Sequence, residues 1–378
     1  MNFEYTGYAE TILTDSGLRG NAVTSLPFED VASLIPRFPK TRYYGSKRRL
    51  LGWIHHALKD LPFNTVLDGF GGTASVSLLF KMMGKEVTFH DGLLCNTIAA
   101  QALLANTLPF SNISEAHHFI DKIEPHNGFI SRTFGGMYFT GEENCWLDGA
   151  AKAIHKITDP AKRSVYFYCL FQACLKKRPF NLFHRANLNL RLNRDVTRSF
   201  GNHVTWETAF QIHMKSSLSD VVEAVKPTMQ PVNILPPGDI SKLNVGYDLV
   251  YLDPPYVSET RTSEDYLNRY HFLEGLSCYA DWGKAIDDTS SIKALKSRKY
   301  ISEWQNKQVF RERLFDLIHA HRRSIVVLSY LAGAYPSEKD IASHFEKNFR
   351  RVRVLTKDFS HALAKEKKVE LLFIGSDT

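Results

Sequence analysis

Four consecutive residues, Asp253-Pro254-Pro255-Tyr256, carry the most specific chemistry in the sequence. Two adjacent prolines fix the backbone dihedral φ and remove two N–H donors, so the turn is stiff and offers carbonyl oxygens as acceptors. An exocyclic amino group fits such a turn, because its two N–H groups can be donated to the Asp253 carboxylate and the Pro254 carbonyl. The Tyr256 ring can then stack on the heterocycle that carries the amine. The alternative is a Pro-Pro turn that only closes a strand.

A glycine-rich segment is the second candidate. Glycine lets the backbone bend sharply and approach a bound molecule closely. Gly69, Gly71 and Ala74 match the spacing of dinucleotide-binding loops, and Asp91 follows about 20 residues later, where a carboxylate can bind a ribose hydroxyl. NAD and S-adenosylmethionine both carry such a ribose, and a plain turn between a strand and a helix remains the alternative. The segment reads Asp68-Gly69-Phe70-Gly71-Gly72-Thr73-Ala74.

Basic charge is concentrated in two segments of the chain. The 378 residues include 47 Lys and Arg against 40 Asp and Glu, a net charge of +7. Residues 31–59 contain no acid, and residues 176–198 contain only Asp195. In the second segment the cations alternate with Phe, Asn and His, which is typical of surfaces that neutralise phosphates and stack on bases. This pattern favours a nucleic-acid surface over the alternative, a solvated basic face.

The composition excludes several other classes of protein. Apolar residues make up 44% and aromatic residues 12%, as in ordinary globular chains. Five cysteines without a CxxC pair argue against a disulfide framework or a structural zinc site. The pairs His55-His56 and His117-His118 have no carboxylates at ligand spacing, so we expect no metal. With no apolar run of about 18 residues and no secretory leader, we expect a cytoplasmic protein that does not enter a membrane.

The predicted elements bring the two candidate motifs to one sheet edge. Short apolar runs predict strands over residues 65–68, 86–91, 247–252, 322–329 and 369–374, with a helix over 74–83. Strands separated by helical stretches favour an α/β fold with a mostly parallel sheet, whose active site lies at the carboxyl ends of the strands. Residues 108–229 contain helical stretches without strand alternation and are interpreted as an inserted domain.

Together these motifs resemble the amino-DNA methyltransferases of the adenine-N6 class. In the alpha, Dam-like order of that family, a lysine-bearing motif and the glycine motif precede the recognition domain and the DPPY motif follows it, as here. The resemblance implies that Asp253, Pro254 and Tyr256 are catalytic. Ala74 departs from the pattern, because the family commonly has glycine there. The implied S-adenosylmethionine contacts are Tyr43 and Lys47 at the methionine end, Asp68, Phe70, Gly71 and Gly72 in the loop, Asp91 at the ribose and Asp239 at the adenine amino group.

Residues 37–43 and 178–188 are further similar to the type IIS restriction-associated subgroup. The resemblance implies a Rossmann-like, S-adenosylmethionine-dependent methyltransferase sheet with an inserted, mainly helical target recognition domain. The expected boundaries are 36–107 and 230–378 for the catalytic domain and 108–229 for the recognition domain, with 1–35 an unassigned arm. The expected partners are double-stranded DNA and a cognate restriction endonuclease. The DNA-binding residues would be Lys176, Lys177, Arg178, Arg185, Asn187 and Arg191.

The predicted activity is methyl transfer from S-adenosylmethionine to N6 of an adenine flipped out of the duplex, in the modification half of a restriction-modification system. A cytosine-N4 methyltransferase would perform the same chemistry, although serine is the commoner residue at the position of Asp253 there. An NAD-dependent oxidoreductase would explain the glycine loop but not the Asp253 motif or the basic insert. A DNA-binding regulator without catalysis is the third alternative.

Overall fold

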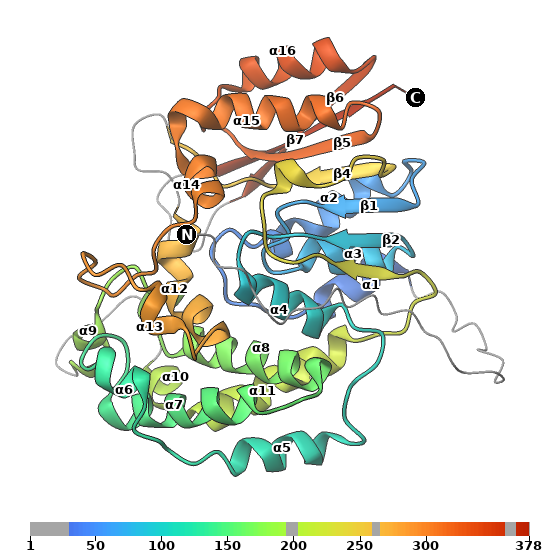
Figure 1. Cartoon of the computed structure of the whole chain (residues 1–378). Coiled ribbons are helices and arrows are strands. Elements are labelled where there is room, and N and C mark those ends of the chain that lie inside the picture. Colours follow the sequence, from blue (N-terminus) through green and yellow to red (C-terminus); the bar gives the residue numbers. More distant parts are fainter. Residues whose placement is uncertain (1–29, 194–202, 259–264, 360–367, 378) are drawn as a thin grey trace.

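A seven-stranded sheet forms the centre of the protein (Figure 1). The computed structural model describes residues 30–193, 203–258, 265–359 and 368–377, so most of the predicted amino-terminal arm lies outside it. The strand order is β3-β2-β1-β4-β5-β7-β6, with β7 antiparallel to both its neighbours and the other pairs parallel. The strands are β1 (Thr65–Asp68), β2 (Glu86–Phe89), β3 (Val232–Ile234), β4 (Leu249–Leu252), β5 (Ile325–Leu331), β6 (Arg351–Phe359) and β7 (Lys368–Ser376).

Helices cover both faces of the sheet, which explains why its central strands are almost wholly apolar. All four residues of β4 are buried. Leu249 and Tyr251 pack in a core with α2, α3 and α4, whereas Val250 and Leu252 face the opposite core, built with α15 and α16. The helices are α2 (Leu51–Leu58), α3 (Ser75–Met82), α4 (Leu94–Leu103), α14 (Lys299–Gln305), α15 (Lys307–Ala320) and α16 (Glu338–Asn348).

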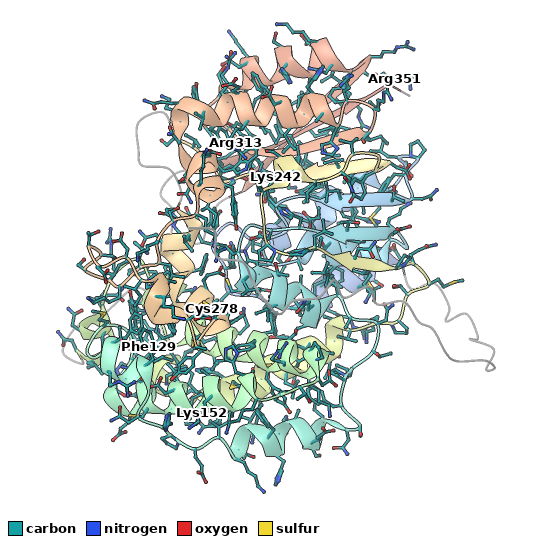
Figure 2. The ribbon with its side chains drawn as sticks, viewed as in Figure 1. Phe129, Lys152, Lys242, Cys278, Arg313 and Arg351 are labelled. Atoms are coloured by element: carbon teal, nitrogen blue, oxygen red, sulfur yellow. The ribbon has the colours of Figure 1, made fainter. Side chains whose placement is uncertain are left out.

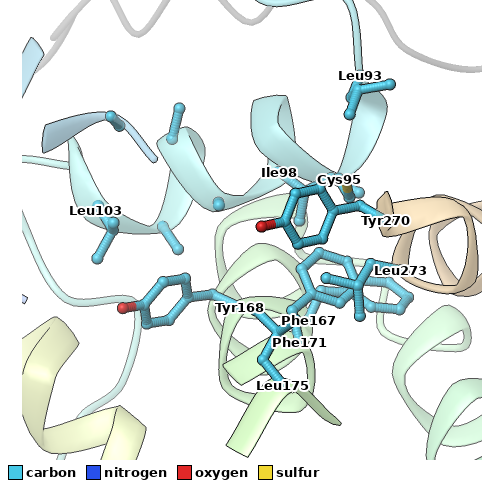
Figure 3. Close-up of a cluster of buried hydrophobic side chains, with 14 of the residues drawn as sticks. Leu93, Cys95, Ile98, Leu103, Phe167, Tyr168, Phe171, Leu175, Tyr270 and Leu273 are labelled. Carbon is cyan, nitrogen blue, oxygen red and sulfur yellow. The ribbon is translucent and has the colours of Figure 1, made fainter. Parts of the chain in front are cut away.

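The chain between β2 and β3 is helical beyond α4, in the lower part of Figure 1. The long helices α8 and α11 lie side by side, and α4 separates α8 from the sheet. Figure 3 shows α4, α8 and α12 meeting in one apolar cluster, with Ile98, Phe171 and Leu273 among its side chains. The helices are α5 (Ile113–Asp121), α6 (Phe129–Thr133), α7 (Gly141–His155), α8 (Pro160–Lys176), α9 (Leu188–Leu192), α10 (His203–Glu207) and α11 (Phe210–Ala224), with α12 (Tyr266–Ser277) and α13 (Trp282–Ala285) after β4 and the short α1 (Val31–Leu34) before α2.

The expected fold class, an α/β sheet with a mainly helical insert, is confirmed. Each predicted strand overlaps an observed strand: β1, β2, β4, β5 and β7. The sequence did not predict β3, which has three residues, or β6, an edge strand whose charged side chains face solvent. The domain boundaries at residues 107 and 229 stay predictions.

Candidate active site

A pocket of about 910 Å³ opens at the carboxyl ends of β1, β2 and β4. Open parallel sheets bind their ligands at this edge. Of the residues predicted to act on cofactor or substrate, Pro254, Tyr256 and Asp239 do not line the pocket. Those that do are Tyr43, Lys47, Asp68, Phe70, Gly71, Gly72, Asp91 and Asp253.

The glycine loop has its shape because larger residues would not fit. A Cβ on Gly71 would lie 2.2 Å from Cε2 of the buried Phe89 ring. Gly72 has a positive φ of 49°, and its N–H is donated to Asp91 at 2.9 Å. Ala74, where the resemblance expects glycine, has a φ of 58° and is the N-cap residue directly before α3. The loop therefore keeps the left-handed geometry at Ala74, at a cost of about 1–2 kcal/mol for a residue with a Cβ.

Asp91 is held in place by three donors. One carboxylate oxygen accepts from Leu93 N (2.8 Å) and Asn96 Nδ2 (3.0 Å), and the other accepts from the Gly72 N–H. Asn96 also donates to the Tyr43 hydroxyl at 3.1 Å, so it links the two predicted cofactor residues. Burial raises the pKa of Asp91, which these hydrogen bonds oppose.

Tyr43 and Asp68 form two further parts of the pocket wall. The Tyr43 ring stacks on Tyr270 at a centroid distance of 4.2 Å, and the Tyr270 hydroxyl accepts from the backbone of Tyr44. Asp68 is 1% exposed and accepts from the Ser77 hydroxyl at 2.6 Å. Burial raises the pKa of Asp68 to about 7. The wall therefore presents both an aromatic ring and carboxyl groups to a ligand.

Asp253 lies directly after β4, and its carboxylate is paired with Lys47. Lys47 Nζ lies 2.8 Å from Asp253 Oδ1 and 3.1 Å from Glu370 Oε1. The Tyr256 hydroxyl accepts from Lys47 at 2.6 Å and can donate to Asp253 (3.2 Å) or Glu370 (3.0 Å). Burial raises the pKa of Asp253 to about 6, which Lys47 opposes and Glu370 reinforces. In the structure Lys47 therefore contacts the predicted catalytic carboxylate as well as the pocket, and Glu370 joins a site in which the sequence did not predict it.

Asp239 and Phe70 flank the far end of the pocket. The Asp239 carboxylate accepts from Arg313 of α15 at 2.6 Å and from the N–H of Ser241. Arg313 is labelled in Figure 2. Burial opposes the charge of this carboxylate, but the hydrogen bonds from Arg313 and Ser241 and the charge of Arg313 together outweigh burial and lower the pKa of Asp239. The Phe70 ring packs edge to face on Trp304 at 5.0 Å, and both rings line the pocket. Apolar surface therefore dominates this end.

Four residues predicted to bind DNA point into the protein instead, which corrects the sequence interpretation. The exposed fractions are 2% for Lys177, 1% for Arg178, 9% for Asn187 and 7% for Arg191. Lys177 and Arg191 both bind Glu143 of α7, at 2.9 and 2.5 Å. Lys177 faces inward because α8 is buried along most of its length, so the chain that leaves this helix remains inside the helical region.

Arg178 anchors the loop that follows α8. Its guanidinium donates to the carbonyl oxygens of Tyr138 (3.2 Å), Leu182 (3.2 Å) and Arg185 (2.8 Å), and to the side-chain oxygen of Asn187. These four bonds occupy the donors that a phosphate would need. The predicted role in DNA binding stays a prediction for Arg185, which is exposed.

For Lys176, too, the role in DNA binding stays a prediction. It is half-buried and donates to Ser217 at 3.0 Å. Residues 194–198 of the basic segment lie outside the described residues.

The described residues contain neither a metal-binding cluster nor a membrane-spanning helix. Across residues 30–193, 203–258, 265–359 and 368–377, no group of three or more His, Cys, Asp or Glu side chains could hold a metal ion. In the same ranges, none of the helices has the length and apolar character needed to span a bilayer.

The chain is similar to known proteins over most of its length. The profile of the family described as D12 class N6 adenine-specific DNA methyltransferase matches residues 43–301, which include the glycine loop and the Asp253 motif. Type II methyltransferase M2.HphI of Haemophilus parahaemolyticus is 25% identical over 352 residues, which cover 90% of this chain and 98% of that protein. Type II methyltransferase M.NlaIII of Neisseria lactamica is 23% identical over 81% of this chain and 87% of its own length. Modification methylase LlaI of Lactococcus lactis subsp. lactis is 24% identical over 77% of this chain and 47% of its own length.

Proposed function

This chain belongs to the D12 class of N6 adenine-specific DNA methyltransferases, and from that premise we propose that its pocket binds S-adenosylmethionine and presents the methyl group to an adenine held at Asp253. The observation that carries this proposal is the position of the Asp253 carboxylate, which is 17% exposed and lies in the wall of the same pocket as the glycine loop and Asp91. One cavity can thus bring donor and acceptor together, which removes much of the entropic barrier of a two-substrate reaction.

The residues around the pocket fit S-adenosylmethionine. Asp91, fixed by three donors, can accept from ribose hydroxyls. Phe70 and Trp304, with Ile240, offer an apolar slot for the adenine ring. When bound, S-adenosylmethionine supplies a methyl group on a positively charged sulfur, which suits a wall that holds carboxylates and the Tyr43 ring.

Asp253 and Pro254 would position and polarise the target amine. The Asp253 carboxylate accepts one N–H of the adenine amino group and the Pro254 carbonyl accepts the other. The nitrogen lone pair then turns toward the methyl group. As the nitrogen bonds the methyl carbon, the carbon–sulfur bond breaks and its electron pair remains on sulfur. The proton that the amine sheds goes to Asp253, whose pKa of about 6 allows it to be released to solvent near neutral pH.

An adenine inside a duplex cannot reach this pocket, so the base is flipped out at a cost of a few kcal/mol. Lys176 and the exposed Arg185 are the cations of the basic segment that we propose as phosphate contacts, and residues 108–229 would form the recognition domain. Because M2.HphI and M.NlaIII are named type II methyltransferases, we further propose that the chain protects DNA against a cognate restriction endonuclease.

The test is to incubate the purified protein with labelled S-adenosylmethionine and unmethylated genomic DNA, digest the DNA to nucleosides and identify the labelled product by mass spectrometry. The proposal expects N6-methyladenosine. Labelled N4-methylcytidine would keep the mechanism and overturn the assignment of the base, and DNA binding without any label would contradict catalysis.

A further inference from the structure

Glu370 is a buried carboxylate that belongs to none of the motifs of the site. It lies on β7, outside the residues 43–301 that the family profile matches, and is 1% exposed. Its Oε1 accepts from the Ser329 hydroxyl of β5 at 2.5 Å and lies 3.0 Å from the Tyr256 hydroxyl. The same oxygen is 3.1 Å from Lys47 Nζ. A second carboxylate therefore faces the lysine that pairs with Asp253.

This arrangement places two carboxylates against one ammonium group in the interior. Burial disfavours the Lys47 ammonium, but Asp253 and Glu370 outweigh it and raise the pKa of Lys47. A simple buried pair of Lys47 and Asp253 would be neutral, whereas Glu370 adds an excess negative charge that costs free energy to bury. Ionisable groups whose pKa is shifted by burial and by neighbouring charges are commonest at functional sites, where their charge takes part in binding or catalysis.

We propose that Glu370 is a positioning residue for methyl transfer: it shares Lys47 and Tyr256 with Asp253, and so keeps the Asp253 carboxylate a strong hydrogen-bond acceptor for the target amine. This inference depends on the proposed function. Lys47 lies 2.8 Å from Asp253 and 3.1 Å from Glu370, so neither carboxylate is fully neutralised by it. Without Glu370, the full charge of Lys47 would fall on Asp253 and weaken its hold on the adenine N–H.

The pH dependence of activity distinguishes this role from a purely structural one. Glu370 raises the pKa of Asp253 through its negative charge. Removing that charge therefore moves the acidic limb of the kcat/KM profile to lower pH, whereas loss of packing alone lowers activity without moving the limb. The groups that face or neighbour Glu370 are Lys47, Tyr256, Asp253, Tyr251, Ser329 and, in register on β6, the exposed Lys357.

The experiment compares Glu370→Gln with the wild type in steady-state methylation across pH 5 to 9. Gln is nearly isosteric with Glu, and we expect kcat to fall by about 10- to 100-fold with little change in KM, because the defect lies in positioning rather than binding. Glu370→Asp keeps the charge and is expected to retain the wild-type acidic limb. Glu346→Gln on α16, at an exposed position, is the matched control and should be unchanged in both respects.

The failure of the proposed function and the failure of the role of Glu370 give different results in this experiment. A wild-type enzyme that does not methylate adenine would overturn the proposed function before any variant is compared. A wild-type enzyme that does so, together with a Glu370→Gln variant of unchanged kcat and unshifted acidic limb, would overturn the role of Glu370. If Glu370→Gln fails to fold by circular dichroism, Ser329→Ala decides instead: it removes the 2.5 Å bond that orients Glu370 but keeps the charge. A lower kcat together with a shifted acidic limb would support the inference, because the released Glu370 then acts less on Asp253; an acidic limb that stays in place, with or without a lower kcat, would refute it.

Discussion

Replacing Arg178 by methionine separates a structural role from a role in DNA binding. The side chain is 1% exposed, and its guanidinium donates to three backbone carbonyls and one amide oxygen. It also lies over the Tyr138 ring at 4.6 Å. If each of the four acceptors left without its donor costs about 1 kcal/mol, and relief from burying a charge offsets part of the sum, the variant loses about 2–4 kcal/mol. That is a large share of the roughly 5–15 kcal/mol that stabilises a typical domain.

The assay is urea unfolding of Arg178→Met beside Arg185→Met, an exposed residue on the same loop. We expect Arg185→Met to stay within about 0.5 kcal/mol of the wild type. DNA titrations at several salt concentrations give the slope of log K, the association constant, against log salt. This slope is negative, and Arg185→Met should make it shallower by about 0.9, the value for one phosphate contact. Arg178→Met, measured where it is folded, should keep the slope. A stable Arg178→Met protein with a reduced slope would refute the structural role and restore the sequence interpretation.

Three further predictions concern the pocket. Asp253→Asn should reduce methylation by at least about 100-fold while the Kd for DNA stays the same, and equal losses in both would mark the residue as structural. Because burial raises the pKa of Asp253 to about 6 and the carboxylate must be ionised to accept an N–H, kcat/KM should fall as the pH drops through about 6; a profile that stays flat to pH 5 would contradict this. Gly71→Ala places a Cβ 2.2 Å from the Phe89 ring. Calorimetry should therefore find the free energy of unfolding lower by about 1–3 kcal/mol and the binding of S-adenosylmethionine weaker. A variant with normal stability and normal binding would disprove the close packing.

The central strands were predictable because burial on both faces demands apolar residues in short runs. Residues 65–68 and 249–252 have that pattern; the first run ends in Asp68 and the second is followed directly by Asp253, so their motifs could be assigned to one site at the sheet edge. The edge strand β6 does not have this run of apolar residues. Its Arg351 and Arg353 lie on an edge strand exposed to water, where charged side chains guard against pairing with another chain.

The DNA-binding role predicted for Lys177 and Arg178 was wrong because clustered charge usually lies on a solvated surface, whereas these two side chains are buried. Lys177 and Arg178 follow α8, whose residues from Ser164 to Leu175 are buried, so the chain enters the loop from inside the protein. Their partners, Glu143 and the carbonyl of Tyr138, come from α7 and from the segment just before it, more than 30 residues away in sequence. Spacing within the segment contains no information about such partners.

The sequence around Glu370 contains a pattern from which a buried charge could be predicted. The run from Val369 to Ile374 is apolar apart from this one acid, and it forms β7 between β5 and β6. Water cannot solvate an acid in the middle of a covered sheet, so the acid requires a cation or hydroxyl donors from elsewhere. Lys47, with no acid within the surrounding residues 31–59, lacks a local partner and has the complementary need. Matching isolated acids in apolar strands with cations in acid-free segments would have proposed this pair, which the fold brings together beside Asp253 at the end of β4.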